Sequence, residues 1–470
     1  MNRCRVLMFG WEFPPFASGG LGTACMGLTK GLKHHGVDVT FVMPKKMTEG
    51  HKSEHVDLIS AHDKIELTEK NIERYLENTS IKELIAINSP ITPYMTSEGY
   101  SKEIDRIRDG NIEVTKEKLI KLVAHTKSDE ASDVYGNNLN HEVWRYRMRA
   151  GLIAQNKEFD IIHAHDWLTF GAGIEAKKAT GKPLIVHIHA TEFDRTGGNP
   201  NPYIYNLEKE GFMHADRICA VSNFTRDRVI NNYGIDPSKV EVVHNAVEHR
   251  DVSHIKPHKI SNEDKIVLFL GRITIQKGPD WFLKTAKLVL DHNPNITFVV
   301  AGSGDMEKNM IEQSAELGIS DKVLFTGFLK GDDIDRAYKM ANLYVMPSIS
   351  EPFGITPLES MRNGTPVLMS KQSGVSEVVN HCLKADFWDT HQMANQILSV
   401  MEHSELHEEM KENGIREVNT FHWNESAQKC VNIYKNVLKE HYVKQEQFTN
   451  ENLNSNNYDI FNNHMFDKKF

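Results

Sequence analysis

The fold is decided by a short apolar run that ends in a glycine turn, IVLFLGR at residues 266–272, followed by ITIQKGPD at residues 273–280. Consecutive apolar residues of this kind are typical of a strand buried on both faces of a parallel sheet. Pro279 then marks a helix start, because proline fits the first helical position, where no N–H donor is needed. Strand, turn and helix in this order form the repeating unit of a doubly wound α/β domain.

Apolar runs of the same kind recur along the chain and predict further buried strands. In the first half they are Val6–Phe9, Val37–Val42, Ile161–Ala164, Leu184–His189, Ile218–Val221 and Val240–His244. After a polar stretch at 248–259 they are Ile266–Leu270, Ile296–Ala301, Val323–Thr326, Leu343–Met346 and Pro366–Met369. Two such series predict two doubly wound, Rossmann-like domains, at 1–253 and 254–422.

Three segments depart from this pattern. Residues 45–145 are charged with helical periodicity, and we expect them to insert helices into the first domain. Residues 423–445 are expected to form one amphipathic helix, because apolar side chains recur on one face from Cys430 to Leu438. The asparagine-rich tail, 446–470, lacks periodicity and is predicted to be disordered.

Composition excludes several classes of protein. The chain has 470 residues, of which 40% are hydrophobic and 25% charged, values typical of a folded globular protein. Lys and Arg number 55 against 64 Asp and Glu, so the net charge of −9 argues against a general nucleic-acid or anionic-membrane binder. The 5 scattered cysteines contain no CxxC pair, and no apolar run reaches the length of a membrane span. We therefore expect a cytoplasmic protein without a disulfide scaffold, zinc ribbon, targeting segment or transmembrane helix.

A glycine-rich turn, GGLG at residues 19–22, follows the first expected strand and opens a helix. Backbone N–H groups at a helix start bind anions, and glycine lets a ligand approach the backbone closely. The spacing is GGxG and not GxGxxG, which disfavours a nicotinamide cofactor. A tight turn required by the fold alone explains these glycines equally well.

Two cations lie in the turn after the strand at 266–270. Arg272 and Lys277 should both sit at the carboxyl end of that strand, the edge at which open α/β sheets bind ligands. Two fixed positive charges there suit a diphosphate, which arginine binds bidentately. The alternative is a solvated loop with two incidental basic residues.

Two glutamates, Glu351 and Glu359, flank the stretch EPFGITPLE at residues 351–359. The stretch follows an expected strand and leads into a helix near Pro357, whose start offers free backbone N–H groups. Both carboxylates are expected to face the cleft between the domains, and carboxylates accept hydrogen bonds from sugar and ribose hydroxyls. Alternatively, Glu359 only complements the helix dipole.

These motifs together resemble the retaining nucleotide-sugar glycosyltransferases of the GT-B fold, namely family 4 and the glycogen and starch synthases of family 5. The matching stretches, in the order that the families share, are SGGLG at 18–22, IHAHDW at 162–167, HIHATEF at 187–193, VS at 221–222, HNAV at 244–247, the 271–278 turn and E-x7-E at 351–359. One departure is Ala17, where bacterial glycogen synthases have a lysine. This departure favours family 4 or a synthase-like enzyme with a different nucleotide.

The resemblance implies a role for each matched position. Arg272 and Lys277 should bind the donor diphosphate and neutralise the leaving group. Glu359 should hold the ribose hydroxyls, Glu351 the transferred sugar, and His189 should lie near the reacting carbon. The other implied donor-binding positions are Gly19, Gly20, Gly302, Gly304, Phe328, Phe353, Gly354, Ile355 and Thr356. The last helix should cross back onto the first domain, and the two domains should face a central cleft.

The expected function is retaining, metal-independent transfer of a hexose, with glucose favoured, from a UDP-, ADP- or GDP-sugar to an acceptor hydroxyl such as that of a growing glucan. No cofactor is expected. Two alternatives stay open, a sugar-nucleotide epimerase or hydrolase on the same fold and an inactive nucleotide-sugar-binding homologue. His163, His165 and Asp166 can be drawn as a metal cluster. However, i, i+2 histidines on a strand also share one face for packing or hydrogen bonding, which is the interpretation we favour.

Overall fold

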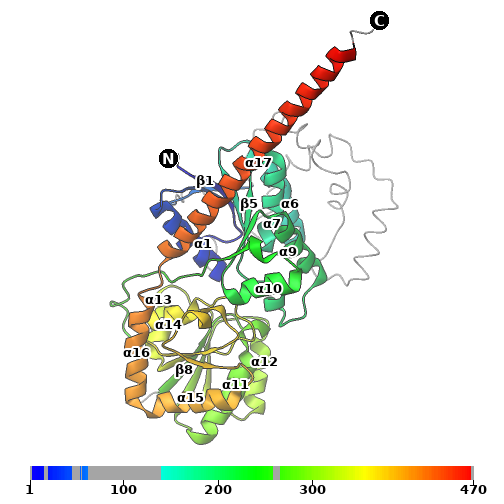
Figure 1. Ribbon diagram of the computed structural model, residues 1–470. Coiled ribbons are helices and arrows are strands. Elements are labelled where there is room, and N and C mark those ends of the chain that lie inside the picture. The colour runs from blue at the N-terminus through cyan, green and yellow to red at the C-terminus, as the bar shows by residue number, and fades with distance from the viewer. Residues whose placement is uncertain are drawn as a thin grey trace, which may run out of the picture.

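The computed structural model describes residues 3–14, 19–44, 53, 55–61, 139–257 and 265–466. Within these ranges the chain forms two parallel sheets, each covered by helices, and a long C-terminal helix that lies against the first sheet's helices (Figure 1). The doubly wound α/β architecture predicted from the apolar runs is therefore confirmed.

The first sheet has 7 strands in the order β3-β2-β1-β4-β5-β6-β7, and all neighbours are parallel. Its strands are β1 (Arg5–Phe9), β2 (Asp38–Met43), β3 (Asp57–Ser60), β4 (Ile161–His165), β5 (Leu184–Ile188), β6 (Arg217–Ala220) and β7 (Val240–Val242). The helices of this part are α1 (Gly20–His34), α6 (Leu139–Gln155), α7 (Trp167–Thr180), α8 (Glu192–Arg195), α9 (Pro202–His214) and α10 (Asn223–Tyr233), with a 3-10 turn η2 (Pro237–Lys239).

The second sheet has 6 parallel strands in the order β10-β9-β8-β11-β12-β13. Its strands are β8 (Lys265–Leu270), β9 (Ile296–Ala301), β10 (Val323–Gly327), β11 (Leu343–Met346), β12 (Val367–Ser370) and β13 (Leu383–Ala385). The helices are α11 (Pro279–His292), α12 (Glu307–Glu316), α13 (Asp332–Met340), α14 (Thr356–Arg362), α15 (Thr390–Glu402) and α16 (Ser404–Val418), with 3-10 turns η3 (Ile275–Lys277) and η4 (Gly374–Glu377).

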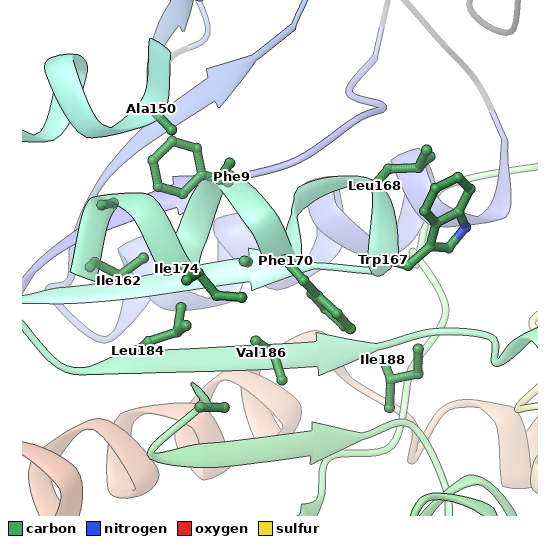
Figure 2. Packing of buried hydrophobic residues seen from close by; sticks show 14 of the residues in the cluster. Phe9, Ala150, Ile162, Trp167, Leu168, Phe170, Ile174, Leu184, Val186 and Ile188 are labelled. Carbon is green, nitrogen blue, oxygen red and sulfur yellow. The ribbon is translucent and has the colours of Figure 1, made fainter. Parts of the chain in front are cut away.

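Each sheet is buried on both faces, as the unbroken apolar strands require. In the first domain, α7 lies over β4 and β5, and side chains of the helix such as Phe170 and Ile174 pack with Leu184 and Val186 of the sheet (Figure 2). All four of these side chains are at most 1% exposed. The opposite face packs against α1 and the C-terminal helix, which share one apolar cluster with it.

The segment predicted as a helical insertion, 45–145, is in part a strand. β3 pairs in parallel with β2, with Leu58 opposite Phe41, and forms the outer edge of the sheet. The helix α6 begins at Leu139, inside the same segment. A strand of 4 residues, DLIS, is too short to show a period in the sequence, which explains why helical periodicity misassigned it. Most of the remaining segment lies outside the described residues.

The C-terminal helix α17 (Trp423–Phe466) is longer than the predicted 423–445 and includes most of the tail expected to be disordered. Its first turns pack on α1, where Trp423, Ala427, Cys430, Tyr434 and Val437 are buried. This packed portion supplies the costly helix nucleus, after which each further residue adds a hydrogen bond to an existing helix. Amino-acid composition alone does not show that a packed helix precedes the tail and favours its helical conformation. Residues 467–470 lie outside the described part.

A search of the described helices for a segment long and apolar enough to cross a membrane finds none.

The contact of α1 with α17 depends on small residues. A Cβ atom at Gly31 would lie 2.6 Å from the backbone oxygen of Trp423 and 2.7 Å from the Ala427 side chain. A Cβ atom at Gly414, in α16, would instead meet nothing closer than a Met361 side-chain atom at 3.5 Å. The two glycines therefore differ in the space available, although both lie inside helices.

We expect Gly31→Ala to lower the free energy of unfolding by about 1–3 kcal/mol, because the added methyl group overpacks this interface. The matched control Gly414→Ala should be neutral or stabilising by up to about 1 kcal/mol, the usual effect of glycine to alanine in a helix. Urea unfolding followed by circular dichroism measures both. Equal effects of the two substitutions would contradict a close α1–α17 contact.

Candidate active site

The carboxyl ends of the two sheets meet through direct contacts between their loops. Ser222, after β6, donates from its hydroxyl to the backbone oxygen of Pro352, after β11, at 2.5 Å. The hydroxyl of Ser350 likewise donates to a carboxylate oxygen of Asp194 at 2.5 Å. Glu377 accepts from the backbone N–H of Asn223 at 2.8 Å. The residues that follow the strands of one domain thus face those of the other, as the ligand edge of open α/β sheets requires.

Lys277 and Glu351 form a close ion pair between two of these loops. Lys277 ends the 3-10 turn after β8, and Glu351 follows β11, which is the neighbour of β8 in the sheet. The Glu351 side chain is 8% exposed, and the Ser348 hydroxyl also donates to it at 3.2 Å. The backbone of Glu351 is fixed as well, since its N–H donates to Gln372 and its carbonyl accepts from Gly374, both at 2.9 Å.

Arg272 lies at the end of β8 in the same loop, but it is exposed and makes no ion pair with any described residue. The two cations predicted from the sequence therefore differ. Lys277 is held by an internal carboxylate, whereas the guanidinium of Arg272 remains open to an incoming anion.

Glu359 lies in the first turn of α14 and receives a hydrogen bond from the Tyr338 hydroxyl at 3.3 Å. Burial raises the pKa of Glu359, and the nearby Asp335 acts in the same direction, while Arg362 opposes both. A carboxyl group accepts a hydroxyl hydrogen bond in either protonation state, so these surroundings are compatible with binding a ribose.

Two side chains in the 351–359 stretch are used inside the domain. Phe353 is 2% exposed and packs in the core, so its predicted donor contact can come only from its backbone. Thr356 accepts from the Tyr344 hydroxyl at 2.8 Å. Gly354 has a φ of 94°, a conformation that glycine adopts without strain. The side chain of Ile355 packs against the cores of both domains.

The remaining predicted glycines divide into packing and open positions. A Cβ atom added at Gly302 would lie 1.9 Å from the Gly271 backbone oxygen, and one added at Gly304 would lie 2.2 Å from the Ile273 backbone oxygen. Both glycines therefore allow the turns after β8 and β9 to touch. At Gly20, by contrast, a Cβ would meet nothing within 4 Å. At Gly19 it would lie 2.4 Å from the Glu12 carboxylate.

Phe328, predicted beside the base, directly follows β10 and is 59% exposed. Its ring lies under the Lys330 ammonium, with 5.6 Å between the nitrogen and the ring centroid. An exposed aromatic face at a strand end is available for stacking.

His189 follows β5 and is positioned by Asp166, which follows β4. The backbone N–H of His189 donates to the Asp166 carboxylate at 2.6 Å, and that of Ala190 donates at 3.4 Å. Asp166 has φ 61° and ψ 167°, a region that is essentially restricted to glycine and costs about 1–3 kcal/mol for other residues. It is the one non-glycine residue with positive φ among the residues described.

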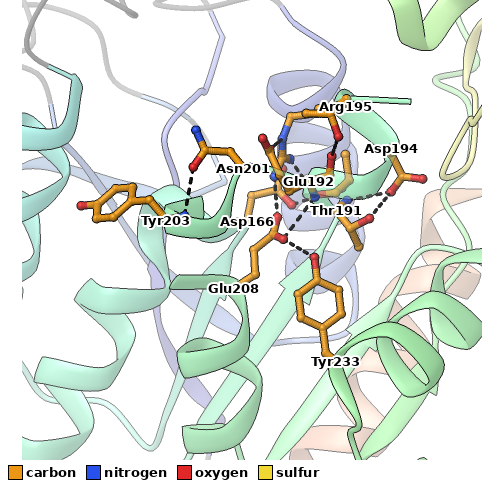
Figure 3. Close-up of polar contacts among 11 residues, drawn as sticks. Asp166, Thr191, Glu192, Asp194, Arg195, Asn201, Tyr203, Glu208 and Tyr233 are labelled. Atoms are coloured by element: carbon orange, nitrogen blue, oxygen red, sulfur yellow. Dashed lines mark hydrogen bonds and ion pairs between the residues drawn. The ribbon is translucent and has the colours of Figure 1, made fainter. Parts of the chain in front are cut away.

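A buried polar network holds the segment that follows His189 (Figure 3). Arg195 donates to the backbone oxygen of Ala190 at 2.7 Å and to Glu192 at 2.8 Å, and it pairs closely with Glu208. Glu208 also accepts from the backbone N–H of Glu192 at 3.1 Å and from the Tyr233 hydroxyl. The loop that presents His189 is therefore anchored to α8, α9 and α10.

Four histidines, His163, His165, His187 and His189, form one stacked cluster on a single face of β4 and β5. His163 and His165 have ring centroids 4.5 Å apart, and His187 and His189 have centroids 4.6 Å apart. Across the strands, Nδ1 of His165 lies 2.9 Å from Nε2 of His189. The i, i+2 spacing indeed places each pair on one face.

Comparison with known proteins agrees with this geometry. Residues 127–251 match the model of Glycosyltransferase Family 4, and residues 252–417 match that of Glycosyl transferases group 1. The two matches meet within the polar stretch between the sheets. Together the two matches cover residues 127–417 and support a GT-B glycosyltransferase of the family 4 or glycogen-synthase-like type.

The individual relatives are glycosyltransferases as well. An uncharacterized glycosyltransferase of Methanocaldococcus jannaschii is 29% identical over 309 residues, which cover 62% of this chain and 78% of the relative. The D-inositol 3-phosphate glycosyltransferase of Salinispora tropica is 26% identical over 334 residues, 64% of this chain and 69% of the relative.

Solved structures share the fold of this glycosyltransferase. Sucrose-phosphate synthase from Thermosynechococcus elongatus superposes with a TM-score of 0.66 at 16% identity, over 93% of this chain and 100% of that one. Anabaena HepE in complex with UDP and glucose gives 0.61 at 14% identity, over 92% and 100%.

Sequence reasoning missed several residues that shape this site. Asp166 is matched in the IHAHDW motif and considered in a metal cluster, but its contact with His189 is not predicted, and Arg195, Glu208 and Tyr233 are not singled out. The HDW and TEF motifs indicate that the segment around His189 is functional. They do not show that its backbone N–H groups donate to Asp166, which follows a different strand. Glu208 lies on a helix, and the sequence alone does not show that its side chain is buried.

Asp166 should act as a positioning residue for His189, and two substitutions separate strain from hydrogen bonding. Asp166→Gly removes the backbone strain and the carboxylate, whereas Asp166→Ala removes only the carboxylate. We expect Asp166→Gly to be more stable than Asp166→Ala by about 1–3 kcal/mol, the cost of this conformation for alanine. Both should lower kcat at least tenfold, measured by nucleotide release. Wild-type kcat in Asp166→Gly would exclude the positioning role.

The network should also make stability depend on pH through Glu208. Burial raises the pKa of Glu208 to about 7, with the Arg195 guanidinium acting in the opposite direction. An acid whose pKa is higher in the folded than in the unfolded state stabilises the fold fully below the unfolded pKa of about 4.3, and this contribution is lost as the pH rises through the folded value.

We therefore expect the free energy of unfolding of the wild type, relative to Glu208→Gln, to decrease by roughly 2–3 kcal/mol between pH 5 and pH 8. The variant keeps a side chain of the same shape that does not titrate. Urea unfolding of both proteins at several pH values gives the difference. A difference that is flat or that increases with pH would show that Glu208 stays ionised in the folded protein.

Proposed function

We propose that the chain is a retaining glycosyltransferase that moves a hexose, with glucose favoured, from a nucleoside-diphosphate sugar to an acceptor hydroxyl. The observation that carries this proposal is the Lys277–Glu351 ion pair at the edge where the two sheets meet, with the exposed Arg272 in the same loop as Lys277. The Lys277 ammonium is suited to the diphosphate of the donor, and the Glu351 carboxylate is suited to the hydroxyl groups of its sugar.

The proposed reaction needs charge stabilisation on the leaving group. Arg272 and Lys277 would neutralise the diphosphate as the glycosidic bond breaks, which is an electrostatic role that requires no metal ion. When the diphosphate approaches Lys277, Glu351 becomes free to accept hydrogen bonds from the sugar hydroxyls and to offset positive charge on the ring. His189, on the facing domain, is the proposed neighbour of the reacting sugar carbon. The acceptor attacks from the face that the diphosphate leaves, so configuration is retained.

Glu359 is the proposed ribose ligand, and exposed Phe328 is the proposed neighbour of the base. HepE, which shares the fold and was solved in complex with UDP and glucose, supports a nucleotide-sugar donor. UDP-, ADP- and GDP-glucose are all tested.

A donor screen distinguishes this proposal from its alternatives. The three nucleotide sugars are incubated with and without candidate acceptors, including a glucan and a phosphorylated inositol, in the presence of EDTA. Nucleotide release that depends on the acceptor, with a product heavier by one hexose, supports a metal-independent transferase. Release without an acceptor indicates a hydrolase, conversion of the sugar without release indicates an epimerase, and binding without turnover indicates an inactive homologue.

Substitutions at Lys277 and Glu359 should affect different kinetic constants. The diphosphate gains charge in the transition state, so Lys277→Ala should lower kcat by roughly 10²–10³-fold. The ribose does not change charge, so Glu359→Ala should mainly raise the KM for the donor. Lys287→Ala, in an exposed pair with Asp291, is the control and should change neither. The reverse pattern would exchange the two roles.

A further inference from the structure

The histidine cluster contains buried nitrogens that no other described residue satisfies. His165 and His187 are 0% and 1% exposed. Both ring nitrogens of His187, and Nε2 of His165 and of His163, lack a hydrogen-bond partner within the described part of the chain. Buried polar atoms are nearly always paired, so four in one cluster call for a specific explanation.

Three of the rings bring one nitrogen each close together; among these rings, His187 has both nitrogens unpaired within the described residues, whereas Nδ1 of His165 and Nε2 of His189 contact each other. His165 and His187 are opposite each other in the β4–β5 register, and His189 follows one strand position further on the same face. One nitrogen from each of these three rings lies within 4.8 Å of the others. The His165–His189 distance of 2.9 Å is close to the roughly 3.3 Å that separates two imidazole nitrogens on a tetrahedral zinc ion. A few tenths of an ångström would convert this contact into a pair of ligands.

The chemical state of the rings also suits a metal. Burial lowers the pKa of His165 and His187 well below the usual value and lowers that of His189. The rings are therefore neutral near pH 7, and neutral imidazole is the form that ligates metals. A donor set of three imidazoles is typical of Zn²⁺ with an open fourth position.

A second group of potential ligands, His163, His187 and Cys219, shares His187 but is less suitable. Nδ1 of His163 is already bonded to the Tyr434 hydroxyl at 2.6 Å. The contact of Cys219 with Cys430, together with burial, raises the pKa of the Cys219 thiol, which disfavours the thiolate that a metal requires. All three of these residues are buried, whereas His189 is partly exposed and offers an entry path.

We propose that His165, His187 and His189 form an inhibitory zinc site, in which Zn²⁺ takes the His189 imidazole away from the donor sugar. The binding site stands on the geometry of the cluster, while the inhibitory effect rests on the role of His189 in the proposed function. Zinc in this site has no part in the transfer reaction, so the enzyme works in EDTA and loses activity when the site is filled.

Equilibrium dialysis of the full chain against ZnCl₂ at pH 7.5, with metal analysis, tests binding without reference to activity. We expect about one equivalent bound by the wild type, and at least tenfold weaker binding by His187→Gln and by His187→Phe, which keeps a ring in the stack. His163→Gln is the matched control, because it removes a ligand of the other group only, and it should bind as the wild type does. Absence of zinc binding by the wild type, or undiminished binding by both His187 variants, would overturn the site.

Cobalt substitution in the wild type gives a test that depends on no variant. Co²⁺ held by the three imidazoles should show tetrahedral visible absorption without a thiolate charge-transfer band. A thiolate band would assign the metal to Cys219 and refute the proposed ligand set.

Activity then tests the second half of the proposal. With a donor that the wild type turns over, added Zn²⁺ should inhibit reversibly, and EDTA should restore the full rate. A confirmed transferase that binds zinc but keeps its rate would remove the inhibitory role and leave the binding site. A chain without transferase activity that still binds zinc in dialysis would refute the proposed function alone.

Discussion

The hydrogen bond from the His189 backbone to Asp166 is the contact on which the geometry of the site depends. It joins the end of β4 to the segment after β5 at 2.6 Å, and it exists only because Asp166 adopts a conformation that is unfavourable for any residue but glycine. A glycine there would be relaxed but could not accept the bond, so a strained aspartate is the arrangement that both turns the chain and holds His189. Strain of this kind persists when the surroundings fix it, and the polar network around Arg195 and Glu208 provides that support.

The ion pair on the other domain follows a related logic. The side chains of Lys277 and Glu351 are largely buried, and the attraction between their charges offsets the free-energy cost of removing each charge from water. In the proposed reaction the diphosphate would supply a second anion for Lys277 and the sugar would supply donors for Glu351, so the pair could separate without leaving a buried charge unpaired. Arg272, which makes no ion pair among the described residues, would add the positive charge that the proposed leaving group requires.

The sequence predicts what depends on local pattern and misses what depends on contacts between distant segments. Unbroken apolar runs predicted both parallel sheets, because burial on two faces leaves that signature in each strand. Phe353 was assigned to the donor site from its motif, but its side chain fills the core, since adjacent positions in a turn point in different directions. The tail after residue 445 was assigned from composition, whereas α17 continues from a packed helix. Asp166 lies in the IHAHDW motif, but the sequence does not show that its carboxylate accepts from the His189 backbone, because that contact joins the ends of two different strands.

The C-terminal helix contacts the histidine cluster through one hydroxyl group. Tyr434 of α17 donates to or accepts from Nδ1 of His163 at 2.6 Å, so a residue far along the chain satisfies a nitrogen inside the histidine cluster. Because α17 follows the second domain but packs on the first, the chain crosses between the domains twice, at 243–257 and again before Trp423. Two crossings leave rotation about a hinge as the simplest relative movement. A rotation that separates the two sheet edges would break the Ser350–Asp194 and Ser222–Pro352 contacts, whereas the packing of α17 on α1 lies within the first domain and would be kept.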